Sequence, residues 1–212
     1  MDAVIFDMDG VIFDSERAVY LEWVALSEKY GFADVQIPYW QVIGVNAALA
    51  KQVFLDFYGP SFPYDAYKAE QSAAYHAKYD GGKLPLKPGV KELLSTLREA
   101  GIFTAIASST RTALVEQQIE DAGLAPFFDR IVGGDQVTRS KPEPDIFLCA
   151  GRGFAPGRCV VIEDSFNGIR AAQRAGMRPV MVPDLLEPDE EMRMRAEAVL
   201  PDLFQVRDYL GL

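Results

Sequence analysis

The sequence predicts an α/β fold: a doubly wound parallel sheet with helices on both faces and a small helical domain inserted after the first strand. Short apolar runs alternate with helical stretches over most of the chain. Such alternation favours parallel strands joined by crossover helices. The first two runs, at Ala3–Phe6 and Phe103–Ala107, are separated by a segment far longer than one crossover needs. The excess length predicts the insertion.

The strands are identified from short apolar runs bounded by polar or turn residues. Strands of a parallel sheet are buried on both faces and therefore read as nearly continuous apolar segments. The expected strands are Ala3–Phe6, Phe103–Ala107, Arg130–Val132, Val160–Ile162 and Val180–Val182.

Helical stretches separate the later strands. Pro88 begins one, with an apolar stripe at helical spacing, and Gly101 ends it. Another is expected from about Thr112 to Ala122, before Gly123. Two more are expected after Pro144 and after Asn167, the last ending at Gly176. From Glu187 onward the tail is acidic and then helical, and we expect it to pack on the sheet edge.

The inserted segment is predicted to be mostly helical. Apolar residues recur at helical spacing in Glu16–Tyr30, Ala47–Phe57 and Asp65–Lys78. Gly81-Gly82 and the Pro85/Pro88 region form the return linker. The predicted domains are therefore an α/β core, residues 1–14 and 84–212, and a helical cap, residues 15–83.

Composition excludes several classes of protein. The 212 residues carry a net charge of −10, which repels nucleic acid and anionic membranes unless a basic patch is present. No apolar run is long enough to span a bilayer, and no signal peptide is apparent, so we expect a cytoplasmic protein. Cys149 and Cys159 fit neither a disulfide framework nor a zinc site, and Cys159 is expected to be a small buried apolar residue.

Four polar patches follow predicted strands. They are Asp7 with Asp9, Ser108-Ser109-Thr110, Ser140-Lys141-Pro142, and Glu163-Asp164. Parallel strands point the same way, so these patches should converge on one crevice, where ligands of such sheets bind. Ionised carboxylates are costly at such a position unless a cation or a reaction uses them.

This inventory is chemically consistent with phosphoryl transfer. A carboxylate such as Asp7 can attack phosphorus and form an acyl phosphate. An approaching phosphate meets repulsion of about 4 kcal/mol per charge pair at about 4 Å, which Mg²⁺ between Asp7, Asp164 and the phosphate would reverse. Ser108 can donate a hydrogen bond to the phosphate and Lys141 supplies a positive charge. Asp9 can protonate the leaving oxygen and then activate water.

With these residues the sequence resembles the haloacid dehalogenase-like hydrolase superfamily, in the helical-cap branch of β-phosphoglucomutases and sugar-phosphate phosphatases. The resemblance rests on four motifs in order: DMDGV, ASST, SKPEPD and IEDSFNGI. It implies a Rossmann-like core, Mg²⁺ as cofactor, and a small phosphorylated metabolite as substrate. Because dehalogenases of this superfamily lack an acid at the position of Asp9, the resemblance disfavours carbon–halogen chemistry.

The resemblance also implies a role for each motif residue. Asp7 matches the nucleophile, Asp9 the general acid and base, and Ser108 and Lys141 the groups that hold the phosphoryl group. The implied metal ligands are Asp7, Asp9 through its main-chain carbonyl, Glu163 and Asp164. The expected substrate or phosphate contacts are Asp7, Gly10, Ser108, Ser109 and Lys141, with Gly44 and Asn46 from the cap.

Within this branch, the cap residues favour a phosphatase over a mutase. Where β-phosphoglucomutases carry a histidine this chain has Val19, and where they carry a lysine and an arginine it offers Ile43 and Ala47. The loop Gly44-Val45-Asn46 is expected to face the site, and its apolar character favours a small leaving group over a bisphosphate. The alternatives are a phosphosugar mutase and a catalytically silent module that binds a phosphorylated ligand. We expect a monomer or weak homodimer.

Several residues also have simple structural interpretations. Ser108 and Asp164 could cap helices, and Lys141 could be a surface lysine. His76, the only histidine, is expected to be structural or exposed, because one histidine cannot build a metal site. Trp23 and Trp40 are expected to pack the cap.

Overall fold

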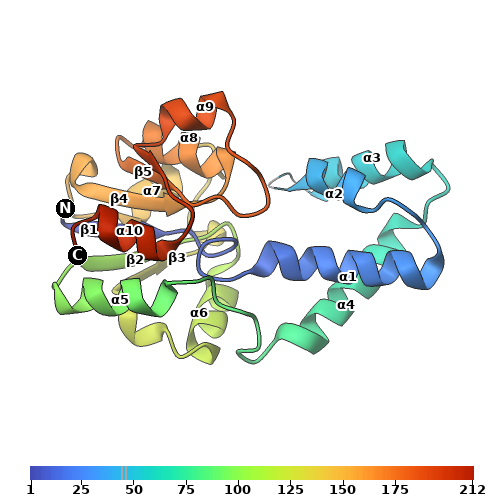
Figure 1. Cartoon of the computed structure of the whole chain (residues 1–212), viewed down its shortest axis with the longest axis horizontal. Coiled ribbons are helices and arrows are strands. Elements are labelled where there is room, and N and C mark those ends of the chain that lie inside the picture. Colours follow the sequence, from blue (N-terminus) through green and yellow to red (C-terminus); the bar gives the residue numbers. More distant parts are fainter. Residues whose placement is uncertain (44, 46) are drawn as a thin grey trace.

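A six-stranded parallel sheet forms one end of the molecule, with strand order β3-β2-β1-β4-β5-β6. The computed structural model describes residues 1–43, 45 and 47–212. The strands are β1 (Ala3–Phe6), β2 (Phe103–Ala107), β3 (Arg130–Val132), β4 (Cys159–Glu163), β5 (Arg178–Met181) and β6 (Ala198–Val199). Figure 1 shows helices around this sheet and a group of helices extending away from it. The predicted fold class is confirmed.

The predicted strand positions hold with small shifts. The first three strands have the predicted bounds, β4 extends one residue further at each end, and β5 begins and ends earlier than predicted. Phe6 of β1 pairs with Ile106 of β2 on one side and Ile162 of β4 on the other. Strand order therefore reverses at β1, and such a reversal opens a crevice at the carboxyl ends of the strands.

Two hydrophobic layers cover the sheet. On one face, Val4 and Phe6 pack with apolar residues of α5 (Val90–Glu99), α6 (Thr112–Asp121) and α10 (Leu203–Tyr209). On the other, Ala3 and Ile5 pack with α7 (Asp145–Ala150) and α8 (Phe166–Arg174). Alternate residues of β1 thus point to opposite faces, as the two-residue period of a strand requires.

The C-terminal segment differs in part from its prediction. It contains α9 (Glu190–Arg195) and α10, but also β6, where Val180 of β5 pairs with Ala198. Two residues are too short for a periodic pattern, so this edge strand could not be recognised from the sequence. Helix α10 packs against α5 and covers the sheet face, rather than only its edge.

Four helices form the cap: α1 (Ser15–Tyr30), α2 (Gln36–Val42), α3 (Ala47–Tyr58) and α4 (Tyr64–Tyr79). They enclose their own apolar cluster, in which Trp23 is buried and stacks beside Phe54 and Tyr64. Trp40 is 39% exposed and stacks on Tyr20. Helix α2 was not predicted, since its seven residues are too few for a clear helical pattern. Pro38 lies in its first turn, where proline is tolerated, and Tyr39 is buried in the cluster.

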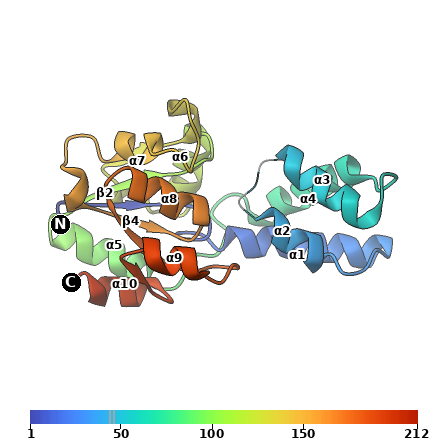
Figure 2. The same cartoon turned by 90° about the horizontal axis from the view of Figure 1, so that it is seen from above.

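Cap and core are joined by two chain segments that lie side by side. The amide of Lys87 donates to the carbonyl of Ile12, and the amide of Asp14 to that of Pro85, each at 2.9 Å. A third contact comes from the loop after β5, where Leu185 packs against the apolar cluster of the cap. In Figure 2, α1 to α4 lie together beside the core and beyond the ends of its strands.

Two further expectations concern the cysteines and the membrane. Cys159 is fully buried in the core, as predicted, and Cys149 is half-buried. Of the helices the structure describes, none has the length and apolar character needed to cross a bilayer.

Candidate active site

The four polar patches meet in one cavity of about 200 Å³. It lies at the carboxyl ends of β1 and β4, where the strand order reverses. Its lining comes from both core and cap: Asp7, Asp9, Glu16, Ile43, Ser109, Lys141, Glu163, Asp164, Ser165 and Asn167. The sheet therefore brings together most of the predicted site residues.

Lys141 is the centre of a buried ion cluster. Its ammonium donates to Asp7 Oδ1, to Glu163 Oε1 at 2.6 Å and to the carbonyl of Ala107 at 3.2 Å. Three acceptors match the three N–H donors of a lysine. The Lys141 side chain is only 7% exposed, so the interpretation as a surface lysine is wrong.

The charges of this cluster shift its proton affinities. Burial raises the pKa of Asp7, Lys141 opposes the rise, and the nearby carboxylates Glu163 and Asp9 add to it. Burial disfavours the ammonium of Lys141, but Asp7 and Glu163 outweigh this and raise its pKa. Burial and the charges of Glu163 and Asp7 raise the pKa of Asp164 well above its usual range. Carboxylates thus outnumber cations here, and the site attracts a further cation.

Glu163 has both carboxylate oxygens engaged and is fully buried. Oε1 accepts from Lys141, and Oε2 accepts from the amide and hydroxyl of Ser165 at 2.7 and 2.8 Å. A Cβ on Gly168 would lie 1.8 Å from Oε1, so only glycine leaves room for this carboxylate. In this geometry Glu163 orients Lys141 and the start of α8.

Asp164 is placed differently. No hydrogen bond joins its carboxylate to any residue in the described part of the chain, and it faces the cavity. Ser165, not Asp164, caps α8 by accepting from the amide of Gly168 at 3.1 Å. Gly10 has a φ of +77° and approaches so closely that a Cβ there would lie 2.3 Å from Asp164 Oδ2. The tight turn after β1 therefore requires glycine at this position for two reasons: the positive φ of its backbone and the close approach of Asp164.

These donors fit Mg²⁺. The carboxylates of Asp7 and Asp164 line one cavity and offer only hard oxygen atoms. The positive charge near them does not balance the negative charge of the carboxylates. Among the described residues there is no group of three or more His, Cys, Asp or Glu side chains arranged as a metal site. Two carboxylates and a main-chain carbonyl form a smaller set, which suits a metal that keeps several waters.

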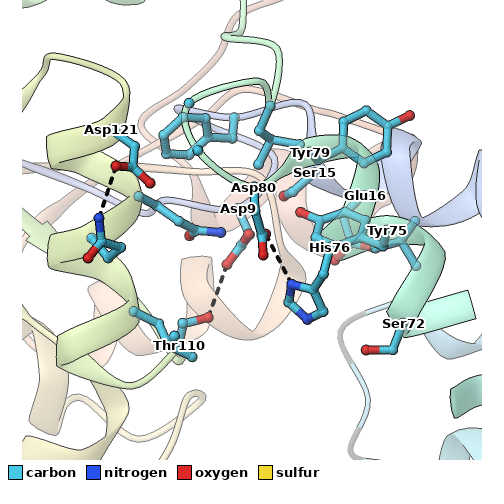
Figure 3. A pocket seen from close by; sticks show the side chains of 18 of the residues that line it. Asp9, Ser15, Glu16, Ser72, Tyr75, His76, Tyr79, Asp80, Thr110 and Asp121 are labelled. Carbon is cyan, nitrogen blue, oxygen red and sulfur yellow. Dashed lines mark hydrogen bonds and ion pairs between the residues drawn. The ribbon is translucent and has the colours of Figure 1, made fainter.

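Asp9 points out of the turn toward the space between core and cap, as Figure 3 shows. The hydroxyl of Thr110 donates to Asp9 Oδ2 at 3.4 Å. Burial raises the pKa of Asp9. A carboxyl with a raised pKa is suited to deliver a proton and later accept one.

The serines after β2 have separate positions. Ser108 is buried, and its hydroxyl accepts from the amide of Thr110 at 3.1 Å. Ser109 lines the cavity, whereas Ser108 does not. Arg111 occupies the N-cap position of α6, so Ser108 is not the helix cap.

Two larger cavities adjoin this site on the cap side. One, of about 410 Å³, is lined by Asp9, Thr110, Gln118 and Asp121 from the core and by Gln71, Ser72, Tyr75 and His76 from α4. The other, of about 560 Å³, lies among the cap helices. The exposed His76 pairs with Asp80 at 3.0 Å at the edge of the first cavity (Figure 3).

Glu16 lines all three cavities. No function was predicted for this residue from the sequence. Its Oε2 accepts from the hydroxyl of Tyr39 at 3.2 Å. Burial raises the pKa of Glu16 to about 7, with Asp9 adding to the rise. Glu16 follows the first motif closely in the sequence, but only the fold shows that the start of α1 faces this cavity.

The cap loop is described in part. Ile43 lines the cavity of about 200 Å³ and Val45 the one of about 560 Å³. Gly44 and Asn46, both expected to contact substrate, lie outside the described residues.

Comparisons with known proteins agree with this geometry. A family model described as haloacid dehalogenase-like hydrolase matches residues 1–176. Protein CbbY of Cereibacter sphaeroides is 30% identical over 100% of this chain and 96% of its own length. The phosphorylated carbohydrates phosphatase of Thermotoga maritima is 29% identical over 85% of this chain and 84% of its own.

Solved structures show the same fold. A family hydrolase of Deinococcus radiodurans R1 with bound phosphate and sodium superposes with a TM-score of 0.82 and 29% identity, covering 100% of this chain and 95% of that one. The CbbY structure from Rhodobacter sphaeroides in complex with phosphate gives a TM-score of 0.74 and 27% identity, covering 97% and 96%.

Proposed function

Because the chain belongs to the haloacid dehalogenase-like hydrolase family, we propose that it is a Mg²⁺-dependent phosphatase that hydrolyses small phosphomonoesters through an aspartyl phosphate on Asp7. Phosphatases are among its relatives, and one of them is named for phosphorylated carbohydrates. The observation that carries the proposal is the convergence of Asp7, Asp9, Lys141 and Asp164 on one cavity.

The reaction has two steps. In the first, an oxygen of Asp7 attacks phosphorus, the bond to the leaving oxygen breaks, and Asp9 gives its proton to that oxygen. In the second, Asp9 takes a proton from a water molecule that attacks the same phosphorus, and the bond to Asp7 breaks. The products are an alcohol and inorganic phosphate.

Lys141 keeps the nucleophile in place. It holds one oxygen of Asp7 and is itself fixed by Glu163. Its charge also opposes the repulsion between carboxylates and phosphate. Ser109, on the cavity lining, and Ser108 beneath it are the proposed hydroxyl contacts of the phosphoryl group.

Asp7, Asp164 and the main-chain carbonyl of Asp9 are the groups that would hold Mg²⁺. When bound, this ion neutralises negative charge that develops on the phosphoryl oxygens. Glu163 then supports the site through Lys141 and the start of α8, consistent with both of its oxygens being engaged.

The cap, residues 15–83, is proposed to enclose the leaving group. Positions at which mutases of this branch carry cations are apolar here and line the cavities: Val19 in both cap cavities, Ile43 beside the phosphate site, and Ala47 in the cap cavity. Their apolar character supports water as the acceptor of the phosphoryl group, rather than a hydroxyl of a second phosphorylated molecule. Gly44 and Asn46 stay proposed contacts. A cytoplasmic location and a monomeric or weakly dimeric state also stay predictions.

A screen of phosphomonoesters tests the proposal. We expect the purified protein to release phosphate from several small esters with Mg²⁺ and to lose this activity with a chelator. Conversion of β-glucose 1-phosphate to glucose 6-phosphate faster than phosphate release would favour the mutase. Binding of phosphoesters with no turnover of any ester would favour the silent module.

A further inference from the structure

We propose that Lys68 on α4 anchors a carboxylate of the leaving group, so that the preferred substrates are phosphorylated carboxylic acids. This inference rests on the proposed phosphatase function and specifies its substrate class. Lys68 was not singled out by the sequence, because its neighbours in the chain carry no recognisable motif.

Lys68 is placed where a leaving group must lie. It lines both cavities on the cap side, of about 410 and 560 Å³, and is exposed within them. Asp9, the proposed proton donor, lines the first cavity, and Glu16 connects both with the phosphate site. A molecule whose ester oxygen receives a proton from Asp9 therefore extends toward Lys68.

Its charge lacks the partner that other lysines of the cap helices have. Lys29, Lys51 and Lys78 each form an ion pair with a carboxylate, at 2.5 to 2.9 Å. Lys68 instead donates to the neutral amide oxygen of Gln71 at 2.6 Å. Within the described part of the chain no carboxylate oxygen lies within 4.0 Å of its ammonium.

The contact with Gln71 orients the ammonium. Gln71 is buried, with 1% exposure, so its amide oxygen is a fixed acceptor. A lysine has three N–H donors, and this bond uses one of them. The other donors remain for a ligand in the cavity. Partial desolvation lowers the pKa of Lys68, although the negative charge of Glu16 opposes this shift.

The surrounding charge favours a single negative charge on the ligand. Asp9, Glu16, Asp80 and Asp121 line the same cavity of about 410 Å³. One lysine offsets one negative charge, so a carboxylate is neutralised while a second phosphate dianion would leave an excess charge facing these acids. A bisphosphate is therefore disfavoured.

The test uses two esters that differ at one group. 3-Phosphoglycerate carries a carboxylate where glycerol 3-phosphate carries a hydroxymethyl group. We expect wild type to favour the acid in kcat/KM, and Lys68→Met to reduce that ratio about tenfold or more, the effect of losing one charge-assisted hydrogen bond. Lys29→Met, which removes an exposed ion pair away from the cavities, should leave the ratio unchanged.

A substrate with a second phosphate group distinguishes recognition of a carboxylate from recognition of a phosphate. Fructose 1,6-bisphosphate should be a poorer substrate than fructose 6-phosphate for wild type. A preference for the bisphosphate that disappears in Lys68→Met would overturn the assignment of a carboxylate. A ratio for the glycerate pair that is equal in wild type and Lys68→Met would overturn the role of Lys68.

Binding measurements keep the inference testable without turnover. In an Asp7→Asn background with Mg²⁺, calorimetry should show tighter binding of 3-phosphoglycerate than of glycerol 3-phosphate, and Lys68→Met should remove this difference. If p-nitrophenyl phosphate and all other esters resist hydrolysis, the phosphatase proposal fails, whereas this binding difference stands or falls separately. Equal binding of the two esters contradicts the inference.

Discussion

The ammonium of Lys141 lies 2.6 Å from Glu163 Oε1 and also donates to Asp7, so one lysine joins the end of β4 to the end of β1. Both carboxylates are almost fully buried. Removal of one partner from a buried ion cluster leaves charge uncompensated in a medium of low polarity. The position of Asp7, the proposed nucleophile, and the stability of the sheet ends therefore depend on the same residue.

Lys141→Met should lower both stability and activity. We expect the free energy of unfolding at pH 7 to fall by about 3–5 kcal/mol, because Asp7 and Glu163 lose their cation. Urea denaturation measures this change, and phosphate release the activity. Lys91→Met, on the exposed side of α5, is the control and should change neither. A Lys141→Met protein within about 1 kcal/mol of wild type would contradict the buried cluster.

Gly10→Ala should weaken metal dependence. The added Cβ would collide with Asp164 Oδ2, and the positive φ adds backbone strain. We expect the Mg²⁺ concentration for half-maximal activity to rise about tenfold or more, because about 1.4 kcal/mol of lost binding gives that factor. Gly157→Ala is the matched control, since nothing lies within 4 Å of its added Cβ. An unchanged Mg²⁺ requirement in Gly10→Ala would exclude Asp164 as a ligand.

Asp9→Asn should separate turnover from binding. An amide of the same shape cannot deliver a proton to the leaving oxygen, so kcat on glycerol 3-phosphate should fall about 10²–10⁴-fold. Affinity for inorganic phosphate, measured by calorimetry, should stay within about threefold of wild type, a change below about 0.7 kcal/mol. Near-normal kcat in this variant would remove Asp9 from the proton transfer.

Glu16→Gln should alter the pH dependence of stability. The pKa of Glu16 is raised from 4.5 to about 7 in the folded protein. The folded state then holds this proton more tightly than the unfolded state, so stability falls as pH rises between these values. Glutamine has no proton to lose. Denaturation is measured with a chelator present. Between pH 5 and pH 8, the free energy of unfolding of Glu16→Gln should rise relative to that of wild type, by at most about 3 kcal/mol.

A control on the same helix sharpens this comparison. Glu28→Gln, an exposed position of α1, should follow the wild-type pH profile. If Glu16→Gln and Glu28→Gln gave the same difference from wild type at pH 5 and pH 8, Glu16 would not be the group responsible.

Much of the fold and of the candidate site could be predicted because the information is local. The strand Ala3–Phe6 is a continuous apolar run, and Asp7 and Asp9 follow it directly. Placing the acids at the end of a parallel strand is enough to place them in the crevice. The stripe of Val90, Leu93, Leu94 and Leu97 likewise predicts the buried face of α5.

The remaining features depend on contacts between distant parts of the chain. Helix α2 is only seven residues long, and its Tyr39 is buried among residues of the other cap helices, a contact that the local sequence does not indicate. The engagement of Glu163 by Lys141 and Ser165 arises from the packing of two loops, and no motif distinguishes it from a metal ligand. Lys68 lines the same cavity as Asp9 because α4 packs along α1, whose first residues also line that cavity.

Phosphate release by wild type and Asp7→Asn tests the central claim most directly. With Mg²⁺ and a phosphomonoester that wild type hydrolyses, the variant keeps the shape of the side chain but cannot form the acyl phosphate. We predict that its phosphate release falls to the level of the uncatalysed reaction, while circular dichroism shows a folded protein. Hydrolysis by Asp7→Asn at the wild-type rate would contradict the covalent mechanism and the role assigned to the end of β1.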